Sequence, residues 1–471
     1  AAVVYDDMAT PFSLTAYREL ERVTEEWRRL AEAAERVGAT LPETCRDAYH
    51  ELVGYQIAAT ANLYALREAE FTNLHYAAQG RAATNELADV AEARFADDRA
   101  MAAHYDTVLA GGKWYGFQSQ PHIGYGDVAR YGPDASWQQP QLHNTAIPDA
   151  LFPPVRRIEL PPSAELGVAV DGSEDWWPAV RGPAAQEPAA LPVLSPFRTG
   201  PAPYLELFAR GSQPFAYRIE AARPWLLVEP AAGRVRTQVR AVVSVDWRRA
   251  PRGTSEVPLT VSGPDGATVT VLAVVENPEP PPADFTGFVE AGGYVSMAAD
   301  HATAVVDTQE VGWKRIPDLG RTGAGMTPWP VTAPSRFPDD GTPRWDGPRL
   351  EYRMWLTTTG PVTAWAYLSP RNDTRSGHGL RYAVSLDDAP PQPVDVIAAT
   401  GADAVAMNRR WQRNTSDNVN RTATSHLVDG PGAHTLTFWM VDPTVVLQNL
   451  VVDTGGLLPS YLGPPESLRI W

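Results

Sequence analysis

Residues 113–140 read KWYGFQSQPHIGYGDVARYGPDASWQQP, and they separate two parts of the chain that have different sequence patterns. Before this stretch, apolar residues recur every three or four positions, as in amphipathic helices. After it, short alternating runs are separated by Pro and Gly turns, as in β-sheets. The stretch itself is rich in Gly, Pro, Gln and aromatic residues, which favour a long loop. We therefore predict that the fold changes from helical to all-β here.

Three long helical segments are predicted before the loop, at residues 13–38, 42–80 and 84–109. Helices of this length with short links pack as an up-and-down bundle, and a break inside the second segment would add a helix. The apolar residues expected to face inward include Leu30, Val37, Val90 and Val108. The only cysteine, Cys45, falls in a helical pattern and is expected to be buried or half-buried.

Two β-units are predicted after the loop. Strand-like runs, of which the first is RIEL at 157–160, recur about every 8–12 residues over the first unit, a spacing typical of an immunoglobulin-like β-sandwich. The run ENPEPPP at 276–282 is typical of a stiff, extended linker. The strands beyond it fit, in order and length, a β jelly-roll of the carbohydrate-binding-module type. The predicted domains are a helical bundle over 1–148, which includes the loop 113–148, a β-sandwich over 149–282 and a jelly-roll over 283–471.

Composition narrows the classes of partner. The 471-residue chain has a formal net charge of −16, which disfavours binding to nucleic acid or to anionic membranes. A ligand that carries a carboxylate would need cationic side chains close to its site, because the negative net charge of the whole protein opposes the binding of an anion. There is no apolar run long enough for a transmembrane helix, and one cysteine excludes an intrachain disulfide. The sequence begins AAVVYDD, which we interpret as a cut through a longer protein.

The loop carries groups that recognise polar ligands. Its aromatic residues argue against disorder, because disordered segments are poor in them. Two interpretations stay open: the loop lines a ligand site, or it is a connector whose rings fill the seam between the bundle and the sandwich. The residues in question are Trp114, Tyr115, Gln118, Gln120, His122, Tyr125, Trp137, Gln138 and Gln139.

Tryptophan faces stack on sugar rings, so several tryptophans of the last unit are candidate platforms, although core packing is the alternative for each. The candidates are Trp313, Trp329, Trp345, Trp365 and Trp411, whereas Trp355 and Trp439 are predicted to lie in the core. The pair Asp387-Asp388 fits a hairpin turn better than a metal site. We find no nucleophile, phosphate or dinucleotide motif and no metal-ligand spacing, so no cofactor and no metal are predicted.

Several longer segments resemble the glycoside hydrolase family 115 xylan α-1,2-glucuronidases. GGKWYGFQSQPHIGY, WQQP and ELGVAVDGSEDWWP resemble the region that follows the catalytic barrel in that family. YVSMAADH, GWKRIPDLGRTGAGMTPWP, AYLSPRNDTRSGHGLRYAVSLDDAPPQ and the segment from HTLTFWMVDP to LLPSYLGPPES resemble its C-terminal domain. The resemblance covers about residues 12–467. The spacer 126–136, ahead of Trp137, is longer than the resemblance leads us to expect.

The resemblance implies an inverting enzyme, homodimeric and extracellular or periplasmic, that removes (4-O-methyl)glucuronic acid from xylan. It also implies that the barrel with the catalytic carboxylates is missing from this chain, so no catalytic residue is assigned. What the chain could supply is substrate contact from the loop and a cation for the uronate, since Arg pairs with carboxylates in bidentate fashion. The predicted substrate-binding residues are Lys113, Trp114, Gln118, His122, Tyr125, Trp137 and Arg375.

Three hypotheses follow. The favoured one is an accessory C-terminal region of such a hydrolase, which supports the cleft and dimerisation and has possible carbohydrate binding to xylan or glucuronoxylan. The alternative is a stand-alone carbohydrate-binding or surface-interaction protein without hydrolase activity. A third makes the chain itself a hydrolase that uses a carboxylate pair of the last unit, since inversion needs one acid and one base across a sugar.

Overall fold

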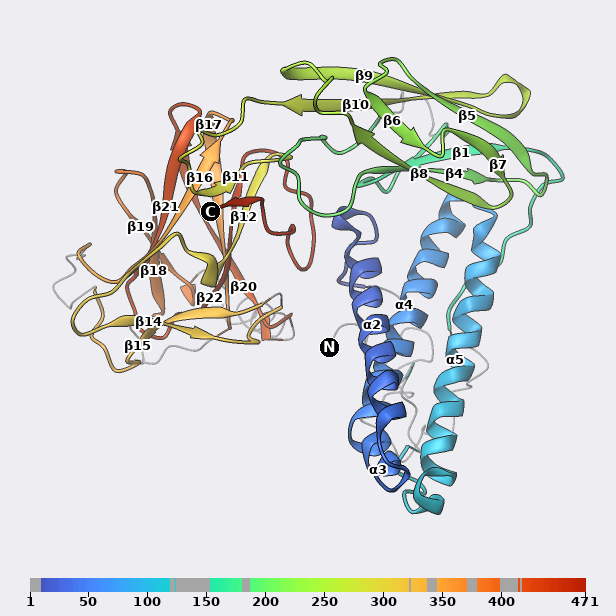
Figure 1. Ribbon diagram of the computed structural model, residues 1–471, viewed down its shortest axis with the longest axis horizontal. Coiled ribbons are helices and arrows are strands. Elements are labelled where there is room, and N and C mark those ends of the chain that lie inside the picture. Colours follow the sequence, from blue (N-terminus) through green and yellow to red (C-terminus); the bar gives the residue numbers. More distant parts are fainter. Residues whose placement is uncertain are drawn as a thin grey trace.

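The computed structural model describes residues 10–118, 123, 153–179, 187–321, 323–336, 345–370, 379–398, 414–415 and 417–471. A helical bundle comes first, and two units follow it, each built of two β-sheets (Figure 1). We call these units the first and the second β-sandwich. The predicted fold class, helices followed by two β-units, is confirmed. The predicted boundary at residue 148 lies outside the described residues.

The bundle contains three long helices, of which the central one packs against both others. Its helices are η1 (Ala16–Arg18), α2 (Glu19–Thr40), α3 (Glu43–Tyr49), the π-helix η2 (His50–Gly54), α4 (Tyr55–Gln79), α5 (Ala83–Thr107) and η3 (Leu109–Gly112). The second predicted segment is thus interrupted by a π-helical turn, which separates α3 from α4. Gly80 ends α4 in the left-handed conformation, with φ 67°, a backbone shape that glycine adopts without strain.

Several apolar residues that were predicted to face inward are exposed instead. Leu30 is 45% exposed and Val37 is 51% exposed, while Val90 on α5 and Val108 just beyond it are 43% and 58% exposed. On α2 the residues that face the neighbouring helices across a cleft include the small Ala31, Ala34 and Gly38, and Leu30 and Val37 do not line it. Cys45 is also exposed, because none of the residues of α3 is buried.

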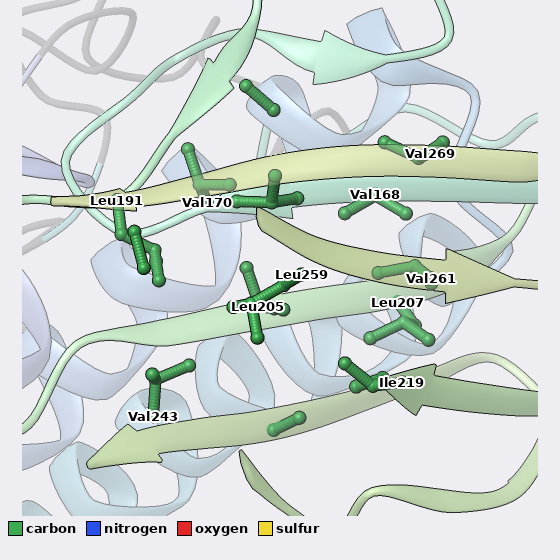
Figure 2. Close-up of a cluster of buried hydrophobic side chains, with 14 of the residues drawn as sticks. Val168, Val170, Leu191, Leu205, Leu207, Ile219, Val243, Leu259, Val261 and Val269 are labelled. Carbon is green, nitrogen blue, oxygen red and sulfur yellow. The ribbon is translucent and has the colours of Figure 1, made fainter. Parts of the chain in front are cut away.

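The first sandwich encloses an aliphatic core between two five-stranded sheets. One sheet has the order β2 (Trp176–Trp177), β1 (Leu166–Val170), β4 (Tyr204–Ala209), β8 (Gln238–Val245) and β6 (Leu226–Glu229). The other has the order β3 (Ala189–Ala190), β10 (Thr268–Asn277), β9 (Gly253–Ser262), β5 (Phe215–Ala221) and β7 (Ala232–Val235), with η6 (Pro264–Gly266) in the β9–β10 turn. Figure 2 shows side chains of both sheets meeting in this core, among them Leu205, Leu207, Leu259 and Val261. The expected strand at 157–160 does not form.

Residues 156–158 run instead along the bundle, where two asparagine side chains act as peptide-like partners. Asn73 on α4 accepts from the Arg156 N–H at 2.6 Å and donates to the Arg156 carbonyl at 2.9 Å. Asn85 on α5 likewise accepts from the Ile158 N–H at 2.9 Å and donates to the Ile158 carbonyl at 3.1 Å. These bonds satisfy the backbone of the segment without a sheet, which explains why its alternating pattern does not make a strand.

The second sandwich has a seven-stranded and a six-stranded sheet. The first follows the order β19 (Gln392–Asp395), β18 (Arg381–Leu386), β21 (Gly432–Met440), β16 (Arg349–Leu356), β11 (Gly287–Val289) and β23 (Arg469–Ile470), with β13 (Ala304–Val306) also paired to β16. The second follows β14 (Gly312–Ile316), β15 (Gly325–Trp329), β22 (Leu447–Asp453), β17 (Gly360–Leu368) and β20 (Asn420–Val428), with β12 (Tyr294–Ala298), which leads into η7 (Ala299–His301), paired to β22.

The second sandwich is held to the bundle by a sharp turn at the start of α2. Tyr17 and Arg18 both have positive φ, 55° and 51°, which is strained backbone for residues other than glycine. The turn presents the Tyr17 hydroxyl to the Leu458 N–H at 3.0 Å. It also places the Glu19 carboxylate to accept from the N–H groups of Tyr461 and Leu462, at 3.0 and 2.8 Å. The C-terminal segment is thereby fixed between α2 and the second sandwich.

Candidate functional site

Three of the predicted site residues, Lys113, Trp114 and Gln118, lie together just beyond the C-terminal end of α5. Figure 1 places this end of α5 far from the first sandwich. Lys113 Nζ lies 4.5 Å from the centroid of the Trp114 ring, which packs edge-on against Phe117 at 5.3 Å. The Gln118 N–H donates to Asp106 Oδ1 at 2.9 Å and ties this turn back to α5.

Trp114 also closes the end of the bundle. It packs on a small cluster formed by Tyr55, Tyr105 and Leu109, in which the two tyrosine rings are 4.7 Å apart. For Trp114, the interpretation that its ring fills the seam with the sandwich is therefore wrong, because the cluster lies at the other end of the helices. Ile123 is buried against Leu66 on the bundle. The remaining predicted site residues, His122, Tyr125, Trp137 and Arg375, lie outside the described residues.

A cleft between α2, α4 and α5 has a volume of about 1210 Å³. His50, in the π-helical turn, faces His104 with ring centroids 5.5 Å apart. Burial, and then the neighbouring His104, lower the pKa of His50. Asn62 donates to the Arg94 carbonyl at 2.8 Å and so links α4 to α5. The walls of this cleft combine alanines such as Ala58 and Ala61 with charged residues such as Arg28 and Asp97.

A buried ionic network joins the bundle to the first sandwich. Glu206 on β4 accepts from Arg81 Nη1 at 2.6 Å, from Arg240 Nη2 at 3.0 Å and from the Tyr76 hydroxyl at 3.3 Å. The Arg81 guanidinium lies between the rings of Tyr76 and Phe208, at 3.9 and 4.2 Å. Burial alone would raise the pKa of Glu206, but Arg81 and Arg240 more than offset it and hold that pKa below its usual range. All members support the interface between the two units.

Two titratable residues of α4 line a cavity of about 420 Å³ beside this network. Burial raises the pKa of Glu68 to about 7, so its carboxyl group titrates near neutrality. Burial, followed by the charge of Arg81, lowers the pKa of His75, which favours the neutral ring. His75 thus forms part of a polar wall of this cavity, whereas Asn73 bonds to the backbone of Arg156.

The second sandwich carries aromatic groups on its outer surface. Trp439 and Trp345 meet edge-on with centroids 6.1 Å apart, and the Trp439 indole N–H donates to Ser385 Oγ at 2.9 Å. The Arg349 guanidinium lies 5.2 Å from the Trp439 ring. Ser385 itself is buried, so we call Trp345, Arg349 and Trp439 the Trp439 surface. An aromatic face beside a guanidinium is a combination that suits the apolar face and the hydroxyls of a sugar.

Other tryptophans depart from expectation. Trp355 and Trp439 were predicted in the core but are only half-buried, because strand alternation gives the core positions to residues such as Tyr352 and Phe438. Of the expected platforms, Trp313 packs against the core instead, and Trp329 is 50% exposed with Lys314 Nζ 4.5 Å above its ring. Trp411 lies outside the described residues. The Asp387 carboxylate accepts from the Thr435 N–H, as a turn residue does.

Among the described residues, no group of three or more His, Cys, Asp or Glu side chains could hold a metal ion. Over the same residues, no helix is long and apolar enough to cross a membrane.

Comparison with protein families identifies the last unit. The model of the glycosyl hydrolase family 115 C-terminal domain matches residues 287–466. Residues 287–466 therefore resemble this C-terminal domain, and we call them the family 115 domain. The match spans the second sandwich from β11 to the C-terminal segment that Glu19 holds, so the Trp439 surface belongs to the family 115 domain. No curated protein matches the chain.

Similar solved structures include BtGH115A, a family GH115 4-O-methyl-α-glucuronidase with specificity for decorated arabinogalactans. It is 14% identical, with a TM-score of 0.45, and the match covers 94% of this chain but only 34% of that protein. The chain thus spans about a third of the length of BtGH115A. Two carbohydrate-binding modules each match 34% of the chain. They are CBM6cm-2 of Cellvibrio mixtus lichenase 5A in complex with cellotriose (11% identity, TM-score 0.21, 95% of that chain) and a family 35 module of Clostridium thermocellum (11% identity, TM-score 0.22, 96% of that chain).

Proposed function

We propose that this chain is the accessory C-terminal region of a glycoside hydrolase that removes (4-O-methyl)glucuronic acid from xylan or a related decorated polysaccharide. The observation that carries the proposal is the family 115 C-terminal domain at 287–466. Its attachment supports the same conclusion, because Glu19 and Tyr17 fix the domain to the bundle through partly buried hydrogen bonds. An accessory region built in this way acts as one rigid support rather than as a module on a flexible linker.

In this proposal the catalytic acid and base come from a barrel upstream of the chain. The role of the turn that holds Lys113, Trp114 and Gln118 is to contact the substrate or the barrel. Lys113 is exposed and remote from the first sandwich, so its charge is accessible to a uronate carried by another domain. A cation placed there meets the requirement that an acidic chain must concentrate positive charge locally to bind a carboxylate.

Dimerisation is the second part of the proposal. The end of the bundle near η2 and η3 exposes large apolar side chains, notably Leu52 (69%), Val108 (58%), Tyr115 (79%) and Phe117 (68%). Apolar side chains that gather on an exposed surface are typical of protein interfaces. We infer that this end of the bundle contacts a second copy of the chain or the upstream barrel.

The first test compares hydrolysis by two lengths of protein. We would measure the release of 4-O-methylglucuronic acid from aldouronic oligosaccharides by this chain and by the protein extended upstream by a barrel's length. The expected result is activity in the longer protein alone. Activity in the 471-residue chain by itself would overturn the proposal and would favour a carboxylate pair within this chain.

A second candidate function is carbohydrate binding without hydrolysis, and the Trp439 surface favours it. The test is retardation of the chain in gels that contain glucuronoxylan. Trp439→Ala is expected to abolish the retardation. Trp471→Ala is the control, because Trp471 lies outside the Trp439 surface and is 83% exposed, and this variant should migrate like the unaltered chain. Equal migration with and without the polysaccharide, for the unaltered chain, would refute this candidate.

A further inference from the structure

A polar cavity of about 640 Å³ lies between α2 and the family 115 domain. Arg22 contributes to one wall from α2, and β12, β14, β22 and the C-terminal segment form the others. The volume falls in the range of about 300–1,000 Å³ that is typical of small-molecule sites. Because the walls come from segments some 440 positions apart, such as Arg22 and Glu466, the cavity exists only when the domain is docked on the bundle.

Two guanidinium groups of the cavity, those of Arg22 and Arg321, form no direct ion pair with a carboxylate of the described residues. Nε of Arg22 is buried and makes no hydrogen bond to any described residue. Arg321 lies 4.2 Å from the centroid of the Tyr461 ring, and burial lowers its pKa, the effect expected when a cation loses water. Within the described part of the chain, no ion pair joins either group to a carboxylate. The Glu19 carboxylate attracts Arg22, and Asp417 and Tyr461 attract Arg321, but none of these groups forms a direct ion pair with the arginines. The cavity therefore holds two positive charges that are partly removed from water, an arrangement that an anion stabilises.

The other charges of the cavity are already matched. Asp300 accepts from Arg315 Nε at 2.7 Å, and Glu466 lies 2.7 Å from His301 Nδ1. Glu26, one turn beyond Arg22, is exposed and forms no ion pair with Arg22. The cavity also contains a hydrogen-bond acceptor without a donor. The side chain of Asn449 is 8% exposed, its Nδ2 donates to Ser296 Oγ at 3.3 Å, and its Oδ1 has no partner in the described structure.

We propose that this cavity binds a sugar acid, with the carboxylate between Arg22 and Arg321 and a hydroxyl group donating to Asn449 Oδ1. Guanidinium groups recognise carboxylates through charge-assisted hydrogen bonds. An orphaned buried acceptor requires a donor, and the cavity carboxylates of Asp300 and Glu466 likewise accept from hydroxyls. A polyhydroxylated acid supplies both kinds of group, whereas inorganic phosphate lacks the set of hydroxyl donors.

The choice of a sugar acid rests on the proposed function, which gives the protein a uronate-decorated substrate. The two guanidinium charges and the orphaned amide oxygen do not depend on it. Such a site is separate from the Trp439 surface, whose residues do not line the cavity. It would hold a uronate side chain of the polysaccharide, or the released acid, against the seam between bundle and family 115 domain.

The test is calorimetric titration of the full chain with D-glucuronate, with D-glucose as the neutral sugar. We expect saturable binding of glucuronate and none of glucose. Arg321→Gln is expected to weaken glucuronate binding at least about tenfold, as for loss of a charge-assisted hydrogen bond. Because Arg321 also packs on Tyr461, Arg22→Gln serves as a second variant with the same expected loss. Arg36→Gln, at an exposed arginine of α2, is the matched control and should bind normally.

Three results would overturn the inference: no binding of glucuronate, binding that neither variant weakens, or binding of inorganic phosphate as tightly as glucuronate. These failures are distinguishable from failure of the proposed function. If glucuronate does not bind here but the upstream-extended protein releases 4-O-methylglucuronic acid, only the inference about this cavity is wrong. If glucuronate binds and the extended protein is inactive, only the proposed function is wrong.

Discussion

Removing the charge of Glu206 should loosen the first sandwich from the bundle. Glu206→Gln keeps the volume of the side chain but leaves Arg81, whose side chain is 2% exposed, without a carboxylate at 2.6 Å. Breaking a buried ion pair by removing one partner costs about 3–5 kcal/mol, because the other charge stays buried. The penalty is smaller for Arg240, because it also forms an ion pair with Glu21 at 3.1 Å. For a denaturant slope of about 2 kcal/mol/M, the urea midpoint should fall by about 1.5–2.5 M.

The assay is urea unfolding followed by far-UV circular dichroism, which reports the helices of the bundle. Glu25→Gln is the matched control, because Glu25 pairs with Arg28 and Arg29 on the exposed face of α2 and should change the midpoint little. The pKa of Glu206 is lowered in the folded state, so its contribution is present above its unfolded pKa and is lost as the pH falls through the folded one. The reasoning is refuted if Glu206→Gln and Glu25→Gln shift the midpoint equally at neutral pH.

Three further variants test other parts of the structure. Glu68→Gln should stabilise the fold relative to the unaltered chain, increasingly as the pH rises from 4.5 to about 7, because the buried native carboxyl resists ionisation. Thermal melts at several pH values check this. The same pH-dependent gain for Glu35→Gln would contradict it. Glu19→Ala should increase hydrogen exchange of the amides in residues 455–466, measured by mass spectrometry, and unchanged protection would show that the turn does not fix this segment. Gly80→Ala forces an alanine into φ 67°, so we expect a loss of about 1–2 kcal/mol in thermal unfolding, and an unchanged melt would contradict the strain argument.

Local patterns were enough to predict the order and type of the elements. The three helices and most strands follow from apolar spacing, since a helix or strand that buries one face must repeat with its own period. The residues of β16 illustrate this, because their alternation separates the buried Tyr352 from the half-buried Trp355. The expected strand at 157–160 failed because Asn73 and Asn85 satisfy its backbone from the bundle. Nothing in the local pattern of that segment carries this information.

The candidate sites also divide into those that the local sequence indicates and those that form only when the units pack together. The turn with Lys113, Trp114 and Gln118 was found because it interrupts both periodicities, although its position at the far end of the bundle was not predictable. The charges of Arg81 and Glu206 were missed, because each looks like an ordinary surface residue in its own segment. No sequence signal pairs two residues that are 125 positions apart and meet only when two units pack together.

The sequence by itself determined the helical and β regions, the acidic charge and the resemblance of residues 287–466 to a known domain family, because these depend on neighbouring residues and on composition. Only the tertiary structure decided which polar groups lose water together. Arg22 and Asn449 show this most clearly: they lie far apart in the chain, and each acquires an unsatisfied buried atom only where α2 meets the family 115 domain. Burial is a property of packing, so the chemistry that depends on it is fixed by the fold.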